Sequence, residues 1–227
     1  MSEALQATGM VLSAMPIGEN DKRVVLLTRE LGKISCFARG ARRPGNHLMA
    51  ASSPAAFGRF SLMQTRDAYV LIRADIDQYF REFSAEPLGI YYAYYFLEFA
   101  DYYGREGIEA TDMLNLLYLS MKALLHENLD NRLVRRIFEL RTMVINGEYA
   151  PEMERLSESA HYTVQYICRT PLTKLYSFMV TPEILKELET MLNRHMDKVI
   201  DRPLRSRKIL DDMIRQDPAG AYGKEMP

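Results

Sequence analysis

The chain has 227 residues, of which 48% are hydrophobic and 26% charged, with a formal net charge of −1. This composition is typical of a folded globular protein. No apolar run is long enough to cross a bilayer, and residues 1–10 lack the basic start and apolar core of a signal peptide, so we expect a cytoplasmic protein. The two cysteines, Cys36 and Cys168, cannot build a disulfide framework and match no metal-ligand spacing.

Charge is distributed unevenly along the chain. Residues 1–80 carry ten basic and seven acidic groups, a balance of +3, while the remainder carries 19 and 23, a balance of −4. A basic front and an acidic back predict two domains with different partners.

The front of the chain reads as β-structure. Short apolar runs with turn residues between them predict strands over residues 7–15, 24–28, 34–38, 57–64 and 69–74. Residues 40–54 are rich in glycine, proline and serine and predict a loop, with no helix signal before the fourth strand. Five short strands in this span indicate a small barrel, and the OB-fold is the natural candidate.

One hairpin, residues 22–43, concentrates positive charge. It holds seven basic residues against one acid, and the basic ones are Lys22, Arg23, Arg29, Lys33, Arg39, Arg42 and Arg43. Side chains alternate along a strand, so Lys33, Phe37 and Arg39 are expected on one face and Cys36 on the other. An aromatic ring between cations is typical of single-strand nucleic-acid binding, because bases stack and phosphates pair. The alternatives are a solvated hairpin with ordinary surface charge and a Phe37 ring packed under a loop.

The back of the chain changes to helical periodicity. The first expected helix begins near Pro87, is capped by Ser84 and ends at residue 103. The second runs over residues 111–127, and the third from Asp130-Asn131 to Asn146-Gly147. Two more are expected from Thr181 to about residue 200 and over the RSRKIL segment. Residues 88–103 are apolar almost all round, with Glu98 and Asp101 as their only charges, which predicts a buried helix. Residues 149–175 predict short helices or irregular chain, and residues 216–227 a disordered tail.

Arg141 falls on the apolar stripe of the third expected helix. A buried guanidinium needs a partner, because leaving its charge unpaired costs several kcal/mol at order of magnitude. Glu98 is one candidate partner, and an ion pair between Arg141 and Glu98 would give the arginine a purely structural role.

Catalytic and cofactor signatures are absent from the sequence. It has no phosphate-binding glycine loop, no GxSxG elbow and no HExxH motif. The four histidines, His47, His126, His161 and His195, are far apart and lack metal spacing. We therefore expect a binding protein without catalytic residues, cofactor or metal, rather than an enzyme acting on DNA.

Three segments carry a resemblance to a known family. They are GMVLSAMPIGENDKRVVLLTRELGKISCFARGARRP near the start, FELRTMVINGEYAP in the middle and RPLRSRKIL near the end. In these segments, and in their order, the chain resembles RecO, the bacterial recombination-mediator and DNA-repair family. The resemblance runs over almost the whole length.

The resemblance implies an α+β protein with an N-terminal OB-fold and a C-terminal helical domain, which we place at residues 1–80 and 81–215. It implies binding of single- and double-stranded DNA, strand annealing, and work with RecR to load RecA onto protein-coated single strands. We assign DNA binding to the seven basic residues of the hairpin together with Phe37.

The family also implies docking of the acidic C-terminal tail of the single-strand DNA-binding protein on the helical domain. Arg132, Arg136 and Arg141 are the expected contacts for that peptide. Many family members carry a four-cysteine zinc module after the YAP segment, but residues 149–175 of this chain hold only Cys168, so we expect no zinc. The alternative function is a helical peptide-binding adaptor whose barrel is purely structural.

Overall fold

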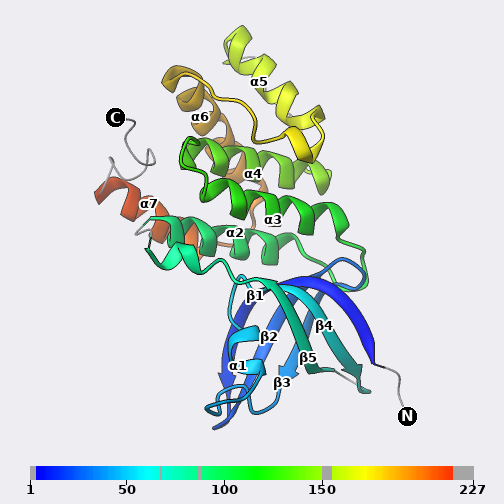
Figure 1. Ribbon diagram of the computed structural model, residues 1–227. Coiled ribbons are helices and arrows are strands. Elements are labelled where there is room, and N and C mark those ends of the chain that lie inside the picture. The colour runs from blue at the N-terminus through cyan, green and yellow to red at the C-terminus, as the bar shows by residue number, and fades with distance from the viewer. Residues whose placement is uncertain (1–3, 67, 86–87, 150–154, 217–227) are drawn as a thin grey trace. The chain divides into compact units, whose positions relative to one another are not determined.

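The computed structural model describes residues 4–66, 68–85, 88–149 and 155–216 (Figure 1). The chain divides into two compact units. One contains Met1–Arg81 and Ala100–Leu114, and the other contains Glu82–Phe99 and Asn115–Pro227. The first unit holds the strands, and the second holds most of the helical residues.

Five strands close into a barrel in the first unit. They are β1 (Leu5–Ile17), β2 (Asp21–Thr28), β3 (Gly32–Ala38), β4 (Phe57–Gln64) and β5 (Tyr69–Gln78). Their order around the barrel is β1-β2-β3-β5-β4, and β1 pairs with β4 to close it. Strands β3 and β5 are parallel, while the other neighbouring pairs are antiparallel. This arrangement is the OB-fold that the sequence predicted, with all five expected strands present.

The barrel core follows from side-chain alternation. In β3, Ile34, Cys36 and Ala38 point inward and are buried with Val24 and Leu26 of the neighbouring strand. Removing this apolar surface from water is the main driving force for closing the barrel. Burial also raises the pKa of the Cys36 thiol to about 12, so it acts as a small core residue and not as a reactive thiol.

A short helix, α1 (Leu48–Ala51), lies between β3 and β4. The expectation of a plain loop over residues 40–54 was therefore wrong at this point. Leu48 and Ala51 are buried, and Leu48 joins the barrel core. This single apolar anchor explains why four residues become helical although the composition of the segment favours a loop.

The remaining chain is helical. Its elements are η1 (Arg81–Ala85), α2 (Gly89–Tyr103), α3 (Thr111–Leu124), α4 (Asn131–Ile145), α5 (Glu158–Arg169), η3 (Leu172–Lys174), α6 (Pro182–Val199) and α7 (Arg205–Gln216). The expected buried helix is α2, whose Phe96 stacks on Phe138 of α4 with 4.2 Å between ring centroids. Stacked aromatic rings of this kind provide the apolar core of the helical unit.

Helix ends agree with most of the expected signals. The Asp130 side chain accepts a hydrogen bond from the Arg132 amide at the start of α4, and Thr181 accepts one from the Ile184 amide at the start of α6. The expected cap at Ser84 was wrong, because Ser84 lies within η1 and α2 begins at Gly89. Pro87 lies outside the described residues.

Two further expectations concern the end of the chain. Helix α5 is a regular helix of 12 residues within a segment expected to hold short helices or irregular chain. The tail expected to be disordered, 216–227, lies outside the described residues except for Gln216, which ends α7. Within the described ranges, no helix combines the length and apolar character needed to cross a bilayer.

Candidate nucleic-acid interface

The outer face of β3 is the centre of the candidate interface. Lys33 and Phe37 alternate with the buried inward residues, as the sequence predicted, and Ser35 lies between them on the same face. Arg39, also predicted for this face, is exposed directly after the strand ends. The Phe37 side chain is 38% exposed, an unusual fraction for a phenylalanine. Its ring is therefore accessible from solvent and is not packed under a loop.

A groove lies beside Phe37 on this face. It has a volume of about 460 Å³ and runs between β2, β3 and the turn that joins β4 to β5. Its walls include Ile17, Arg23, Ser35, Phe37, Gln64 and Tyr69. The face formed by strands 2 and 3 and the loop between strands 4 and 5 are where OB-folds bind oligonucleotides. The groove therefore occupies the position that the fold uses for nucleic acid.

Arg23 is held in place at this groove. It lies directly opposite Phe37 in the antiparallel pair of β2 and β3. Its Nε donates a hydrogen bond to Ser35 Oγ at 2.8 Å, which fixes the guanidinium on the outer face of the sheet. A planar cation beside an exposed ring suits a phosphate next to a stacked base.

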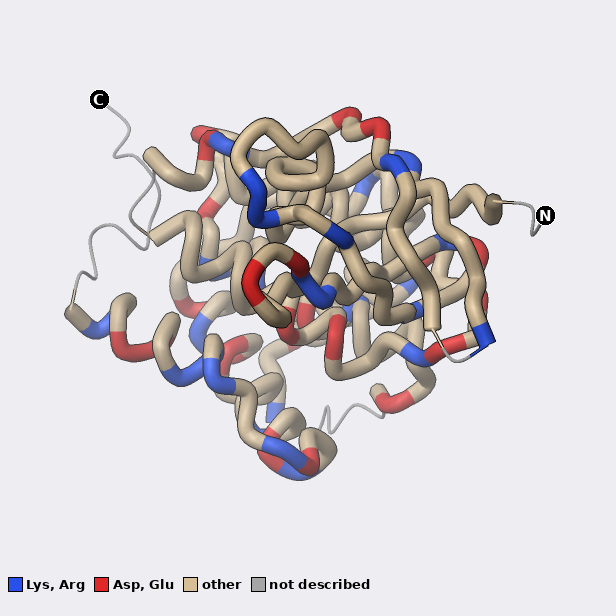
Figure 2. The backbone as a smooth tube through the Cα atoms, turned by 90° about the horizontal axis from the view of Figure 1, so that it is seen from below, with Lys and Arg blue, Asp and Glu red and all other residues tan. Residues whose placement is uncertain are grey.

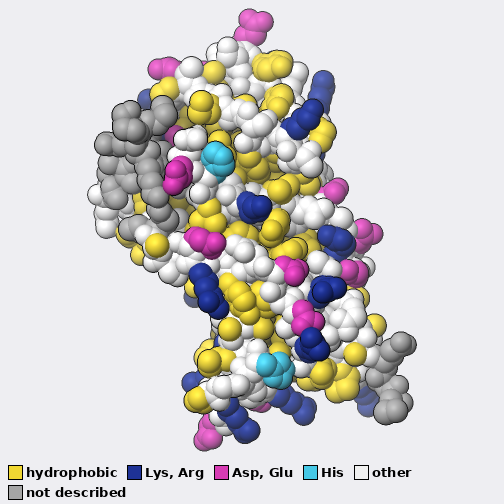
Figure 3. Space-filling model, in the orientation of Figure 1, with side chains coloured by type: hydrophobic (Ala, Val, Ile, Leu, Met, Phe, Trp, Pro, Cys, Tyr) yellow, Lys and Arg dark blue, Asp and Glu magenta, His cyan; other side chains and the backbone are white. Residues whose placement is uncertain are grey.

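The loop after β3 carries three exposed arginines, Arg39, Arg42 and Arg43. Arg42 Nη1 donates to the Gly18 carbonyl at 3.0 Å. Arg39 and Arg43 make no side-chain hydrogen bond or ion pair with any residue that the structure describes. Basic positions are marked along the backbone in Figure 2, and Figure 3 shows Lys and Arg side chains projecting from the barrel surface. The guanidinium groups of Arg39 and Arg43 are therefore available for phosphates.

Two lysines assigned to DNA binding are engaged within the first unit. Lys22 Nζ donates to the Met49 carbonyl at 3.1 Å and to Ser52 Oγ at 3.0 Å, so it ties β2 to α1. Burial and the nearby Arg42 lower the pKa of Lys22. Lys33 Nζ donates to the Asp101 carbonyl at 2.6 Å and lies 3.4 Å from its carboxylate. Both lysines therefore stabilise the fold around the barrel.

Arg29 also differs from the exposed arginines. It follows the end of β2 and is half-buried, and its Nε has no hydrogen-bond partner among the described residues. Its backbone amide donates to the Thr8 carbonyl and its carbonyl accepts from the Ala110 amide. The structure does not bring Arg29 to the groove beside Phe37.

Of the residues that line the groove, only Arg23 and Phe37 were predicted as site residues, and those not anticipated include Gln64, Arg66, Tyr69 and Glu106. Arg66 is exposed in the turn between β4 and β5. Tyr69 pairs with Cys36 where β5 runs parallel to β3, so the start of β5 lies next to the groove. The OB-fold strand order was the signal that could have found the turn and Tyr69, because it places strand 5 beside strand 3.

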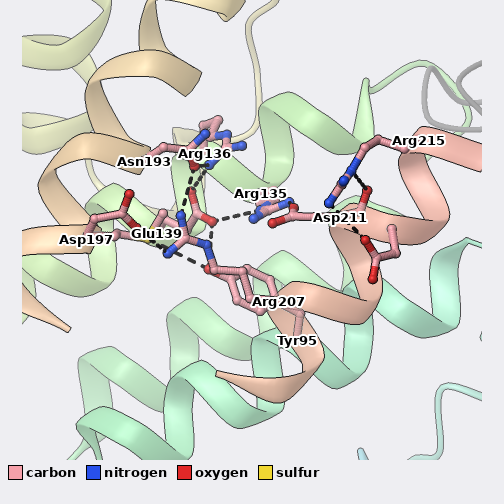
Figure 4. Close-up of polar contacts among 11 residues, drawn as sticks. Tyr95, Arg135, Arg136, Glu139, Asn193, Asp197, Arg207, Asp211 and Arg215 are labelled. Carbon is pink, nitrogen blue, oxygen red and sulfur yellow. Dashed lines mark hydrogen bonds and ion pairs between the residues drawn. The ribbon is translucent and has the colours of Figure 1, made fainter. Parts of the chain in front are cut away.

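The arginines of α4 lie in a different environment. Arg136 was expected to bind a partner peptide, but its Nη1 donates to Glu139 at 2.8 Å and to Asn193 at 3.0 Å, and its side chain is almost fully buried. Arg135 donates to the other Glu139 oxygen at 2.8 Å and to Asp211 of α7 at 2.6 Å. Figure 4 shows the Glu139 carboxylate between the two guanidinium groups.

Glu139 is the centre of this buried cluster. Burial alone would raise the pKa of its carboxyl, but Arg136 and Arg135 outweigh burial and hold that pKa below its usual range. Its Oε1 also accepts a hydrogen bond from the Tyr95 hydroxyl at 2.7 Å. The carboxylate is therefore charged in the core and pairs with two arginines, and Asp211 supplies the second negative charge. This is a structural role.

The other two expected peptide contacts are also engaged. Arg132 Nη2 lies 3.2 Å from the Asp130 carboxylate, and about 20% of its side chain is exposed. Arg141 Nη1 donates to the carbonyls of Ile167 and Cys168 in the last turn of α5. A cation is favourable there, because the unpaired carbonyls and the helix dipole make a helix C-terminus negative.

The expected ion pair between Arg141 and Glu98 was wrong. Glu98 instead accepts hydrogen bonds from the Arg205 and Ser206 amides and from Ser206 Oγ at the start of α7. Arg141 does have a partner, as its place on an apolar stripe requires. That partner is a pair of backbone carbonyls, which side-chain patterns do not reveal.

No group of three or more histidine, cysteine or acidic side chains is placed to hold a metal ion anywhere in the described ranges. In the segment where many members of the resembled family carry zinc, Cys168 is half-buried and its backbone carbonyl accepts a hydrogen bond from Arg141. A guanidinium at this position is a poor neighbour for a metal ion, because both are positive.

Comparison with known proteins gives two family matches. The profile described as "Recombination protein O N terminal" matches residues 1–80, and "Recombination protein O C terminal" matches residues 147–208. Together the two matches cover more than half of the chain. The first corresponds to the strands of the barrel, and the second begins after α4 and ends within α7.

Curated relatives align over most of the chain. The protein from Exiguobacterium sibiricum is 28% identical over 92% of this chain and 97% of its own length. The protein from Acetivibrio thermocellus is 24% identical over 87% of this chain and 92% of its own length. The protein from Moorella thermoacetica is also 24% identical, over 100% of this chain and 97% of its own length. All three carry the name DNA repair protein RecO.

Proposed function

The chain belongs to the RecO family, and from that premise we propose that it is a DNA-binding recombination mediator in DNA repair. It binds single- and double-stranded DNA, anneals complementary strands and acts without a catalytic step. With RecR it helps to load RecA onto single strands coated by the single-strand DNA-binding protein. Because these partners act on chromosomal DNA, we place it with the nucleoid in the cytoplasm.

The observation that carries this proposal is the exposed face of the barrel. Phe37 borders a groove at the position where OB-folds bind oligonucleotides, and Arg23 is fixed opposite it. The adjoining arginines, Arg39 and Arg43, have no side-chain partner among the described residues. A surface with accessible cations beside an accessible ring is suited to phosphates and bases together.

The mechanism follows from charge. Two DNA strands repel each other through their phosphates, and guanidinium groups that contact phosphates displace condensed counterions and lower that repulsion. Phosphate contacts carry no base information, so complementary pairing between the strands supplies the sequence. No nucleotide needs to be consumed for this reaction.

A titration of labelled single-stranded DNA at two salt concentrations tests the proposal. We expect binding that weakens steeply with salt, and faster annealing of complementary strands when the protein is present. Salt-insensitive binding, or no binding, would overturn it. Addition of RecR and of protein-coated single strands then tests the loading step by RecA filament formation.

We also propose that the helical unit binds the acidic tail of the single-strand DNA-binding protein. Of the three arginines expected to hold that tail, Arg136 is buried on Glu139 and Arg141 is bonded to the end of α5. Arg132, with about 20% of its side chain exposed, is the one that a peptide carboxylate can reach most readily.

Two variants separate binding from stability. Arg132→Ala should weaken binding of a synthetic acidic peptide that ends in an apolar residue, with little change in the melting temperature. Arg141→Ala should lower the melting temperature, because it leaves the α5 carbonyls without their donor. Unchanged peptide affinity in Arg132→Ala would remove this arginine from the proposed site.

A second candidate function has one observation in its favour. A hollow of about 620 Å³ lies between α5 and the start of α6, and its lining includes Tyr162, Tyr166, Phe178, Met179 and Ile184. Tyr162 and Met179 are strongly exposed there. Such a surface fits a peptide-binding adaptor with a purely structural barrel. Loss of peptide binding in Tyr162→Ala, with no DNA binding by the wild type, would favour that function.

A further inference from the structure

We propose that the groove beside Phe37 holds a single unpaired base, and that Glu106 reads an amino group on the edge of that base. The inference rests on the DNA binding proposed above and specifies what the groove accepts. Glu106 lines the groove, and its carboxylate makes no hydrogen bond or ion pair with any residue in the described part of the chain.

The backbone that carries Glu106 is fixed against the barrel. The Lys33 amide donates to the Arg105 carbonyl at 2.9 Å, and the Gly107 amide donates to the Leu31 carbonyl at 3.0 Å. Glu106 itself bridges to Gly32 in an antiparallel contact. These bonds on both sides of Glu106 hold its backbone at the β2–β3 turn, from where its side chain lines the groove.

Gly32 makes this close approach possible. A Cβ atom at Gly32 would lie 2.1 Å from the Arg105 carbonyl oxygen and 2.4 Å from that of Ile108, and the residue has a φ of +67°. Both the left-handed backbone and the contact with a neighbouring chain segment require glycine. The position of Glu106 is therefore built into the fold and does not depend on a mobile loop.

The groove combines groups that fit a base better than a phosphate. Phe37 offers an exposed ring for stacking, and Gln64 and Ser35 offer neutral polar atoms. The Glu106 carboxylate would repel a phosphate placed inside the groove, whereas it can accept a hydrogen bond from an amino group. Arg23, fixed on Ser35, and the exposed Arg66 remain for phosphates beside the base.

This arrangement implies a chemical preference. Cytosine, adenine and guanine each carry an exocyclic amino group, while thymine and uracil present a carbonyl oxygen in its place. In a duplex each ring is stacked between its neighbours and cannot stack on Phe37, although one hydrogen of each amino group stays accessible from a groove. The groove can therefore engage only an unpaired base, whereas the arginines of the β3–α1 loop can contact phosphates of either form of DNA.

Cytosine and uracil provide a close comparison, because they share the pyrimidine ring and differ along one edge: cytosine has an amino group at C4 and an acceptor at N3, whereas uracil has a carbonyl at C4 and an N–H at N3. A carboxylate that faces C4 accepts a hydrogen bond from cytosine and meets the uracil carbonyl oxygen unfavourably. The probe is a short oligonucleotide of abasic sites with one central base, either cytosine or uracil. We expect the wild type to bind the cytosine probe about tenfold more tightly, in the range of one specific edge contact. Fluorescence anisotropy measures both affinities.

Two variants test the assignment to Glu106. In Glu106→Gln the side-chain amide can both donate and accept, so the preference for cytosine should fall to about even. Asp77→Asn removes the same charge from an exposed position on β5 that does not line the groove, and it should keep the wild-type preference. Equal binding of the two probes by the wild type, or an unchanged preference in Glu106→Gln, would overturn the inference.

The outcomes also separate this inference from the DNA binding on which it rests. Salt-sensitive binding of both probes without discrimination would contradict the base site alone. Absence of salt-sensitive binding to any single strand would contradict the proposed function together with the base site.

Discussion

The arginines after β3 and the arginines of α4 are the same side chain in opposite environments. Arg39 and Arg43 are exposed and make no side-chain hydrogen bond or ion pair with the described residues, whereas Arg135 and Arg136 are buried on the two oxygens of Glu139. The first pair keeps its charge available to a polyanion. The second pair uses its charge inside the protein.

The difference shows that a basic segment becomes a binding surface only when the fold leaves its cations without acids. In α4 the charge of each arginine is neutralised within the cluster, so removal of one partner should act on stability. In the barrel the neutralising partner would be a phosphate from outside, so removal should act on affinity and its salt dependence.

The largest expected effect comes from breaking the α4 cluster. Glu139→Ala removes the carboxylate that two buried guanidinium groups share, which leaves Arg135 with Asp211 alone and Arg136 with the neutral Asn193. Loss of one partner from a buried ion pair costs about 3–5 kcal/mol of unfolding free energy. Chemical denaturation followed by far-ultraviolet circular dichroism measures the loss. Glu139→Gln, which keeps the side-chain volume, distinguishes loss of charge from loss of packing.

The matched control for that prediction is an exposed ion pair. Arg73 lies 2.8 Å from the Asp75 carboxylate, with 68% and 48% of their side chains exposed. Asp75→Ala should change the unfolding free energy by about 1 kcal/mol or less, because solvent screens an exposed pair. Similar losses in the two variants would mean that burial of the α4 cluster is not what makes it stabilising.

A smaller effect is expected from the exposed ring of the barrel. If a base stacks on Phe37, Phe37→Ala should weaken single-strand binding by about 1–3 kcal/mol and leave the dependence on salt unchanged. Ile72→Ala is the control, because Ile72 is 45% exposed on β5 and does not line the groove. Equal losses in both variants, or none, would remove Phe37 from the interface.

No effect is expected from metal chelation. A structural zinc site needs about four cysteine or histidine ligands, and no described cluster of this kind is present. Treatment with a chelator should leave the melting temperature unchanged, and elemental analysis should find no stoichiometric zinc. About one zinc per chain would contradict this and would require ligands from outside the described residues.

Local patterns in the sequence predicted the barrel well. The alternation along β3 correctly placed Phe37 outward and Cys36 inward, because a strand fixes its side-chain directions by itself. Which cations remain available depends on distant chain segments. Lys33 donates a hydrogen bond to the carbonyl of Asp101, a residue distant in the sequence, and the residues around Lys33 contain no pattern that predicts this contact.

The candidate groove shows the same limit. Arg23 and Phe37 were predicted from one hairpin, but Gln64 and Tyr69 reach the groove because β5 pairs with β3. Knowledge of the OB-fold strand order would have located these two. Glu106 follows α2, outside the strands of the barrel, and only the packing of its segment on Gly32 brings it there.

Helix α5 was not located, since its segment was predicted only as short helices or irregular chain, although the signals of the helix were present. Ala160, Val164 and Ile167 repeat at helical spacing and are buried, and Ser157 caps the helix. The mixed polar composition of residues 149–175 and their two prolines made the helical repeat of these apolar residues hard to recognise. Arg141 could not be assigned either, since its partners are backbone carbonyls that exist only once α5 has formed.

The most direct test of the central claim compares two triple variants. In the first variant, alanine replaces Arg39, Arg42 and Arg43. In the second, alanine replaces three residues of the other basic cluster of the chain, Arg202, Arg205 and Lys208. The slope of log affinity for single-stranded DNA against log salt concentration is then measured for each. Both variants lose the same charge, so they differ only in where it is lost.

Each phosphate contact on a single strand contributes about −0.7 to this slope, so the first variant should flatten it by roughly 2 if all three arginines meet phosphate. Its affinity should fall similarly for unrelated DNA sequences, and the second variant should retain the wild-type slope. A wild-type slope in the first variant with a flattened slope in the second would contradict the account and move the DNA site from the barrel to residues 202–208.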